Sequence, residues 1–153
     1  MRAAITRIGA IALLCLGTTA HGASITNGSF EDGLAGWTTF NGTLVATPTT
    51  VNLLGESGSK SATDGIRFAY LQAGAGTGIF TMISQSFDAF AGQRVSFDIF
   101  FDAADYLPFD DYGYAGLRNT STNTLEILYD KFVSDVGDYQ HDGWTNVDYD
   151  ITE

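Results

Sequence analysis

The chain has 153 residues, of which 7 are lysine or arginine and 18 are aspartate or glutamate, and its single cysteine is Cys15. Such an acidic chain repels nucleic acid and anionic lipid, so the composition excludes a nucleic-acid-binding protein. With one cysteine there is no internal disulfide and no cysteine metal cluster.

Residues 1–23 have the pattern of a secretory signal peptide. A short basic segment precedes an apolar run over residues 8–16, and small and polar residues follow. The apolar run is far shorter than the roughly 20 residues of a membrane-spanning helix, so no membrane span is expected. Cleavage after Ala20 and cleavage after Ala23 both fit the pattern. Cys15 raises a lipoprotein alternative, although the residue before it is not small. We expect a secreted protein, extracellular or held at the cell surface.

Residues 24–153 are long enough for one domain with its own core. Two of the seven basic residues lie in the signal peptide, which leaves 5 basic and 18 acidic residues and a net charge of −13. Helix formers are scarce, and β-branched and aromatic residues alternate with turn formers, which predicts an all-β fold. In chain order, we expect strands over residues 24–31, 37–47, 66–71, 79–87, 94–101, 113–118, 124–130 and 146–151. Residues 48–64 read as an irregular connection, and 119–123 as the turn of a hairpin. Short strands at this spacing are typical of a two-sheet antiparallel β-sandwich or jelly roll.

The strand over residues 94–101 organises the predicted core. Val95, Phe97, Ile99 and Phe101 fall on one face in strict alternation, and only Phe100 places an aromatic ring on the polar face. An acidic and aromatic loop follows directly. A rigid strand that leads into a loop of this composition is a common arrangement at binding sites.

Carboxylates in this loop could bind calcium. Asp105, Asp110 and Asp111 lie within seven residues, and calcium takes six to eight oxygen ligands. The spacing is not that of an EF-hand, and the alternative is that these side chains cap turns.

Aromatic residues near the same carboxylates could bind a sugar, because flat rings pack against its C–H face while polar groups hold its hydroxyls. The candidate ligand-binding residues are Tyr106, Tyr112 and Tyr114 with Asp110 and Asp111, and Trp144 beside Asp142. The alternative for Tyr112 and Tyr114 is packing within the fold.

Catalysis receives little support from the sequence. In a chain with 18 acidic residues, some pair of carboxylates meets the spacing of a glycosidase by chance. A catalytic triad would require His141, which lies in a polar segment that reads as an exposed turn. We therefore expect a protein that is not an enzyme.

Two groups of motifs resemble a known family. Asn27-Gly-Ser-Phe-Glu31 followed by Gly36-Trp37 resembles the opening of galactose-binding-like β-sandwiches, which include many carbohydrate-binding modules. The segments 105–112, 136–139 and 143–144 resemble a subset found in secreted bacterial proteins of the PEP-CTERM class and in adhesins. The resemblance implies a calcium ligand at Glu31 with a partner in a last strand. It also implies further strands beyond residue 151, so the chain resembles a C-terminally truncated member.

These observations predict a secreted, non-catalytic module that binds a polysaccharide, a surface glycan or extracellular matrix, with Ca²⁺ as a stabilising ion. Two alternatives remain open. One is a structural or adhesive surface protein that binds other proteins, and the other is a small polysaccharide hydrolase.

Overall fold

The computed structural model describes residues 2–4, 25–40, 44–55, 57–73 and 80–152. The all-β prediction is confirmed: these residues form antiparallel strands and one short helix, α1 (Val133–Val136). The strands are β1 (Arg2–Ala4), β2 (Thr38–Phe40), β3 (Leu44–Ala46), β4 (Thr50–Asn52), β5 (Ser59–Ser61), β6 (Tyr70–Gln72), β7 (Met82–Ser84), β8 (Ser86–Asp88), β9 (Arg94–Ile99), β10 (Tyr112–Asn119), β11 (Thr124–Phe132) and β12 (Thr145–Asp150).

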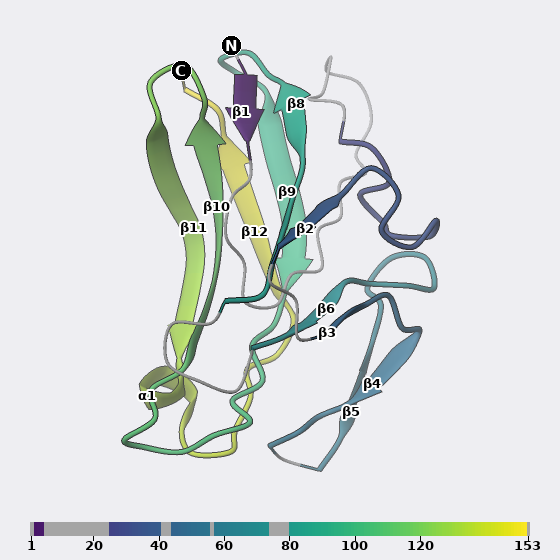
Figure 1. The fold of residues 1–153 in the computed structure, drawn as a ribbon, viewed down its shortest axis with the longest axis vertical. Helices are drawn as coiled ribbons and strands as arrows, with labels where there is room; N and C mark the ends of the chain where they lie inside the picture. The colour runs from purple at the N-terminus through teal and green to yellow at the C-terminus, as the bar shows by residue number, and fades with distance from the viewer. Residues whose placement is uncertain (1, 5–24, 41–43, 56, 74–79, 153) are drawn as a thin grey trace.

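The largest sheet has the strand order β11-β10-β1-β8, and its long β10–β11 hairpin forms the left side of Figure 1. The hairpin pairs Tyr112 with Phe132 at one end and Asn119 with Thr124 at the other, which confirms the predicted hairpin. Its register shifts at Gly116, where an added Cβ would lie 2.5 Å from the Glu126 carbonyl oxygen. Glycine therefore permits the close approach of the two strands.

The predicted organising strand is β9, which pairs with β12 along its whole length. Val95, Phe97 and Ile99 are buried on one face, as their alternation predicts. They share one core with buried side chains of the large sheet, among them Leu117 of β10 and Tyr129 of β11. Burial of each large apolar side chain contributes about 1.5–3 kcal/mol, so this shared core joins the two sheets.

Phe100, the exception to that alternation, has its own core. It is buried with Phe68 and Tyr70, and Trp144 packs against this second cluster. The rings of Phe100 and Trp144 meet edge to face, with centroids 4.7 Å apart. Two consecutive buried aromatics at 100 and 101 therefore serve two different clusters, one on each side of the strand end.

The predicted strand over residues 24–31 is wrong: residues 26–29 and 31–36 form turns instead. Asn27 adopts a left-handed backbone with φ of 51°, and its side chain bonds to three backbone groups. Its own carbonyl oxygen accepts a bond from Trp37 Nε1 at 3.1 Å. Phe30 is 1% exposed and lies 5.1 Å from the Trp37 ring. The Asn-Gly-Ser-Phe-Glu motif thus forms a compact turn that inserts an aromatic ring into the core.

Several other elements differ from the prediction in extent. The described parts of the strand expected over 37–47 are β2 and β3, which pair with different strands, β7 and β6. The described part of the strand expected over 79–87 contains β7 and β8. The connection over 48–64 contains a small hairpin, β4–β5. Within the strand expected over 79–87, residues 81, 83, 85 and 87 are buried, which is the alternation typical of a strand.

Most of the predicted signal peptide lies outside the described residues. Its residues 2–4 form β1, which lies between β8 and β10 (Figure 1). Across the ranges given above, no helix is long and apolar enough to span a membrane.

Candidate functional site

The loop that follows β9 is held in place by the segment 137–142. The Ala103 amide donates to the Gln140 carbonyl at 2.9 Å, and the Tyr139 amide donates to the Asp105 carbonyl at 2.9 Å. The Leu107 amide donates to Asp138 Oδ1 at 2.9 Å. These bonds join positions more than 30 residues apart, so the loop has a defined conformation before any ligand arrives.

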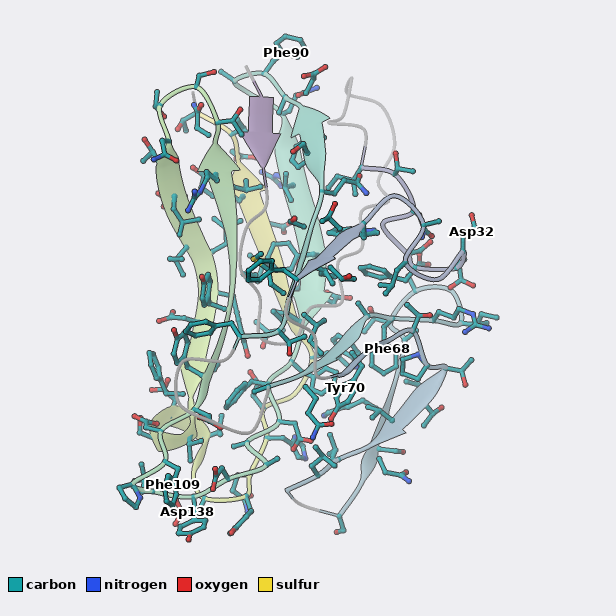
Figure 2. All side chains as sticks on the ribbon, in the orientation of Figure 1. Asp32, Phe68, Tyr70, Phe90, Phe109 and Asp138 are labelled. Atoms are coloured by element: carbon teal, nitrogen blue, oxygen red, sulfur yellow. The ribbon has the colours of Figure 1, made fainter. Side chains whose placement is uncertain are left out.

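Three aromatic rings gather on this loop and its support. Tyr106 lies 5.4 Å from Phe109 in an edge-to-face contact and 5.6 Å from Tyr139 in a tilted contact. The three residues are 42%, 54% and 45% exposed, respectively. We call Tyr106, Phe109 and Tyr139 the aromatic platform. Figure 2 places Phe109 and Asp138 at the lower end of the molecule, beyond the ends of the long strands. Contiguous exposed aromatic surface of this kind is typical of an interaction site.

Carboxylate charges act on the platform and on one another. Burial raises the pKa of Asp111, and the charges of Asp105 and Asp110 raise it further. Burial also raises the pKa of Tyr139, with contributions from Tyr106 and from the charges of Asp105 and Asp138. The same carboxylates therefore act on one another and on the platform, so this end of the molecule has a negative potential.

Two of these carboxylates also have structural roles. Asp110 accepts bonds from the Ser134 amide at 2.8 Å and from the Ser134 hydroxyl at 2.9 Å. Asp105 Oδ1 accepts a bond from the Tyr106 amide at 2.8 Å. The turn-capping alternative therefore describes Asp105 and Asp110 well.

Tyr112 and Tyr114 lie apart from the platform, on one face of β10. Their rings stack at 6.0 Å with an interplanar angle of 13°. Phe132, opposite Tyr112 in the hairpin, and Phe80 also contact the Tyr112 ring. Because residues two apart in a strand share a face, these rings form a cross-strand cluster on the sheet.

Trp144 belongs to the second core cluster and not to the platform. Its ring packs against Phe68 and Phe100, and its Nε1 donates to the Ser61 carbonyl at 3.1 Å. The structure therefore places the predicted ligand-binding indole between the β4–β5 hairpin and the end of β9.

Glu31 is separated from the other candidate calcium ligands. Its Oε1 accepts bonds from the Ile66 amide at 2.8 Å and the Arg67 amide at 3.0 Å. In Figure 2 its neighbour Asp32 lies at the right edge, far from Phe109 at the lower end. Among the described residues, no three carboxylate, histidine or cysteine side chains gather closely enough to hold a metal ion.

His141 is half-buried in a β-bridge with Asp102, whereas the sequence predicts an exposed turn. Its neighbour Asp142 accepts bonds from the Tyr129 hydroxyl and the Phe101 amide, both at 2.5 Å. Both oxygens of this carboxylate therefore bind the protein itself.

The prediction of site residues included Tyr106 but missed Phe109, Tyr139 and Asp138. Phe109 stands in the predicted binding loop between proline and aspartate, where an apolar ring has no strand pattern to explain it. Tyr139 carries no comparable signal, because only the tertiary fold brings it to position 106.

The chain matches none of the protein-family models, curated proteins or solved structures with which it was compared.

Proposed function

We propose that this chain is a secreted, non-catalytic β-sandwich domain that binds carbohydrate through the aromatic platform. The observation that carries the proposal is the aromatic platform: its three rings are exposed, and the Tyr106 ring contacts both Phe109 and Tyr139. The charges of Asp105 and Asp138 act on Tyr139. Exposed rings offer flat apolar surfaces to the C–H face of a sugar. Carboxylate oxygens accept hydrogen bonds from its hydroxyls.

The anchoring of the loop supports binding by a preorganised site. Tyr106 is flanked by the Tyr139–Asp105 and Leu107–Asp138 bonds, so its backbone does not have to be ordered when a ligand binds. Lower ordering cost raises affinity without additional contacts.

Binding without turnover is the proposed mode because two carboxylates of the loop and its supporting segment already have partners for both oxygens. Asp110 is bonded through both oxygens to Ser134, and Asp142 through both oxygens to Tyr129 and Phe101. A glycosidase needs two carboxylates free to act on the scissile bond. Calcium stays part of the proposal as a stabilising ion, with Asp111 as its candidate ligand, because the charges of Asp105 and Asp110 already raise the pKa of that carboxyl.

The test compares binding of the secreted protein to a panel of soluble and immobilised polysaccharides with that of two variants. Tyr106→Ala removes the central ring of the platform. Phe90→Ala removes a ring that is 64% exposed at the opposite end of the molecule (Figure 2). Loss of one stacked ring costs about 1–2 kcal/mol, or roughly 5- to 30-fold in Kd.

We expect Tyr106→Ala to weaken binding and Phe90→Ala to leave it unchanged, with no release of reducing sugar in any sample. Equal losses in both variants, or no binding to any polysaccharide, would refute the proposal. Release of reducing sugar by the original chain would support the hydrolase instead.

A further inference from the structure

The β1 strand fills a gap that is one strand wide in the large sheet. It pairs antiparallel with β8 on one side, where Arg2 lies opposite Asp88 and Ala4 opposite Ser86. On the other side it pairs antiparallel with β10, where Ala3 lies opposite Asn119. Figure 1 shows β1 between the two strands at the upper end of the sheet. It therefore connects two strands that have no other partner on their facing edges among the strands the structure describes.

β1 lies within the segment predicted to be removed as a signal peptide. Removal leaves the facing edges of β8 and β10 with unpaired N–H and C=O groups. Open sheet edges with unpaired backbone groups recruit another strand. The gap has two such edges, so one incoming strand would be paired on both sides.

We propose that the gap between β8 and β10 is a strand-acceptor site for an extended segment of a partner protein, antiparallel to both strands. Insertion of a peptide strand at sheet edges is an established mode of protein recognition, in which the backbone supplies affinity and alternate side chains supply specificity.

The register defines the chemistry of the incoming strand. Residues directly opposite each other in antiparallel strands share a face of the sheet. The position opposite Phe87, which is buried, therefore faces the core and takes an apolar residue. The positions opposite Asp88 and Ser86, which are exposed, lie on the outer face.

The outer-face positions favour particular polar and charged side chains on the incoming strand. A basic residue suits the position opposite Asp88. The next outer position of the incoming strand lies between Ser86 and Arg118. The Nε atom of Arg118 is buried and has no hydrogen-bond partner among the described residues. A carboxylate or amide at that position would supply the missing acceptor. The partner strand thus has a basic residue, an apolar residue and a residue with a hydrogen-bond acceptor at three successive positions.

A partner protein fits the site better than a second copy of this chain. After removal of the signal peptide the net charge is −13, so two copies repel each other, while a strand with a basic residue is attracted. The inference rests on cleavage of the signal peptide, which is part of the proposed function, but not on carbohydrate binding.

The test uses the protein as processed by a secreting host, with its N-terminus verified by mass spectrometry. The processed chain has no cysteine, because Cys15 is removed with the signal peptide. Asn119→Cys introduces a thiol at the edge of the gap. Thr124→Cys is the matched control, because Thr124 lies opposite Asn119 on β11, the neighbouring strand away from the gap.

The probe is a synthetic peptide with the sequence of residues 1–7 that carries Ala3→Cys, with its thiol held as a mixed disulfide with thionitrobenzoate. Attack by the protein thiolate joins protein and peptide and releases thionitrobenzoate anion, which is followed by its absorbance. Directly opposite residues of antiparallel strands lie at a Cα separation that a disulfide spans. A second peptide with Ala4→Pro lacks the amide that a central strand position requires.

We expect the peptide to release thionitrobenzoate faster when it reacts with Asn119→Cys than when it reacts with Thr124→Cys. With the proline peptide, we expect the two variants to react at the same rate. If Asn119→Cys impairs folding, Ser86→Cys with an Ala4→Cys peptide tests the other edge. Equal rates at both protein positions, or no effect of proline, would overturn the proposal. So would a dimer of the processed wild-type chain in light scattering, which would identify a second copy as the occupant. Retention of residues 2–4 in the secreted protein would also overturn it, because the gap would then stay filled. Absence of sugar binding would leave this result unaffected.

Discussion

The bond between Tyr129 and Asp142 provides a sharp test of how the fold is held together. Tyr129 lies on β11 and is 8% exposed, and its hydroxyl donates to Asp142 Oδ2 at 2.5 Å. The other oxygen of Asp142 accepts a bond from the Phe101 amide at 2.5 Å. The carboxylate therefore links the β10–β11 hairpin to the segment that leaves β9. Tyr129→Phe deletes only the hydroxyl and keeps the ring in the core.

The expected cost follows from the charge of the acceptor. Hydrogen bonds to charged groups contribute about 1.5–3 kcal/mol, about twice the value for neutral pairs. For a domain of this size, that loss lowers the midpoint of thermal unfolding by about 5–12 °C. The matched control is Tyr149→Phe: Tyr149 is half-buried beside the same core, and its hydroxyl makes no hydrogen bond among the described residues. We expect a shift of at most about 2 °C for this control.

The pH dependence gives a second readout. Burial raises the pKa of Tyr129, and the hydrogen bond and charge of Asp142 raise it further. The unfolded chain then loses the tyrosine proton near pH 10, while the folded chain keeps it. The contribution to stability is present below pH 10 and is lost as the pH rises above it, by up to about 1.4 kcal/mol per pH unit. Urea unfolding between pH 8 and 11 should show a shallower alkaline decline for Tyr129→Phe than for the original chain. An unchanged midpoint together with an unchanged alkaline decline would refute the reasoning.

Three further predictions concern the opening turn, the second core and calcium. Asn27→Ala removes three side-chain hydrogen bonds and leaves an alanine at φ of 51°, so it should destabilise the fold by about 2–4 kcal/mol. Asn27→Gly should destabilise the fold less, because glycine adopts this backbone conformation without strain. Trp144→Ala should lower the free energy of unfolding in urea by about 2–4 kcal/mol and leave polysaccharide binding intact. A loss of binding without a loss of stability would show that the indole contacts the ligand. Calcium at a hundredfold excess over its Kd should raise the free energy of unfolding of the original chain by about 2.7 kcal/mol relative to its value in chelator. Asp111→Asn should abolish this increase, and the control Asp148→Asn should retain it. Unfolding that is the same in calcium and in chelator would remove the ion from the proposal.

The candidate site was only partly predictable, because its parts come from distant segments. Tyr106 stands out in the sequence within an acidic loop, but its contact with Tyr139 depends on bonds that join the loop to residues 137–142. Tyr112 and Tyr114 look equivalent to Tyr106 in composition. They belong to β10, however, and their rings are directed by the pleat of that strand.

Alternation of apolar and polar residues determined the all-β class and the buried face of β9, and the turn residues at 119–123 determined the long hairpin. This pattern is local, because successive side chains of a strand point to opposite faces whatever lies beyond them. Only the tertiary structure decided that Phe100 serves a second core, that Asn27 begins a turn, and that β1 lies between β8 and β10. These features depend on which segments meet across the fold, and residue spacing along the chain does not encode those meetings.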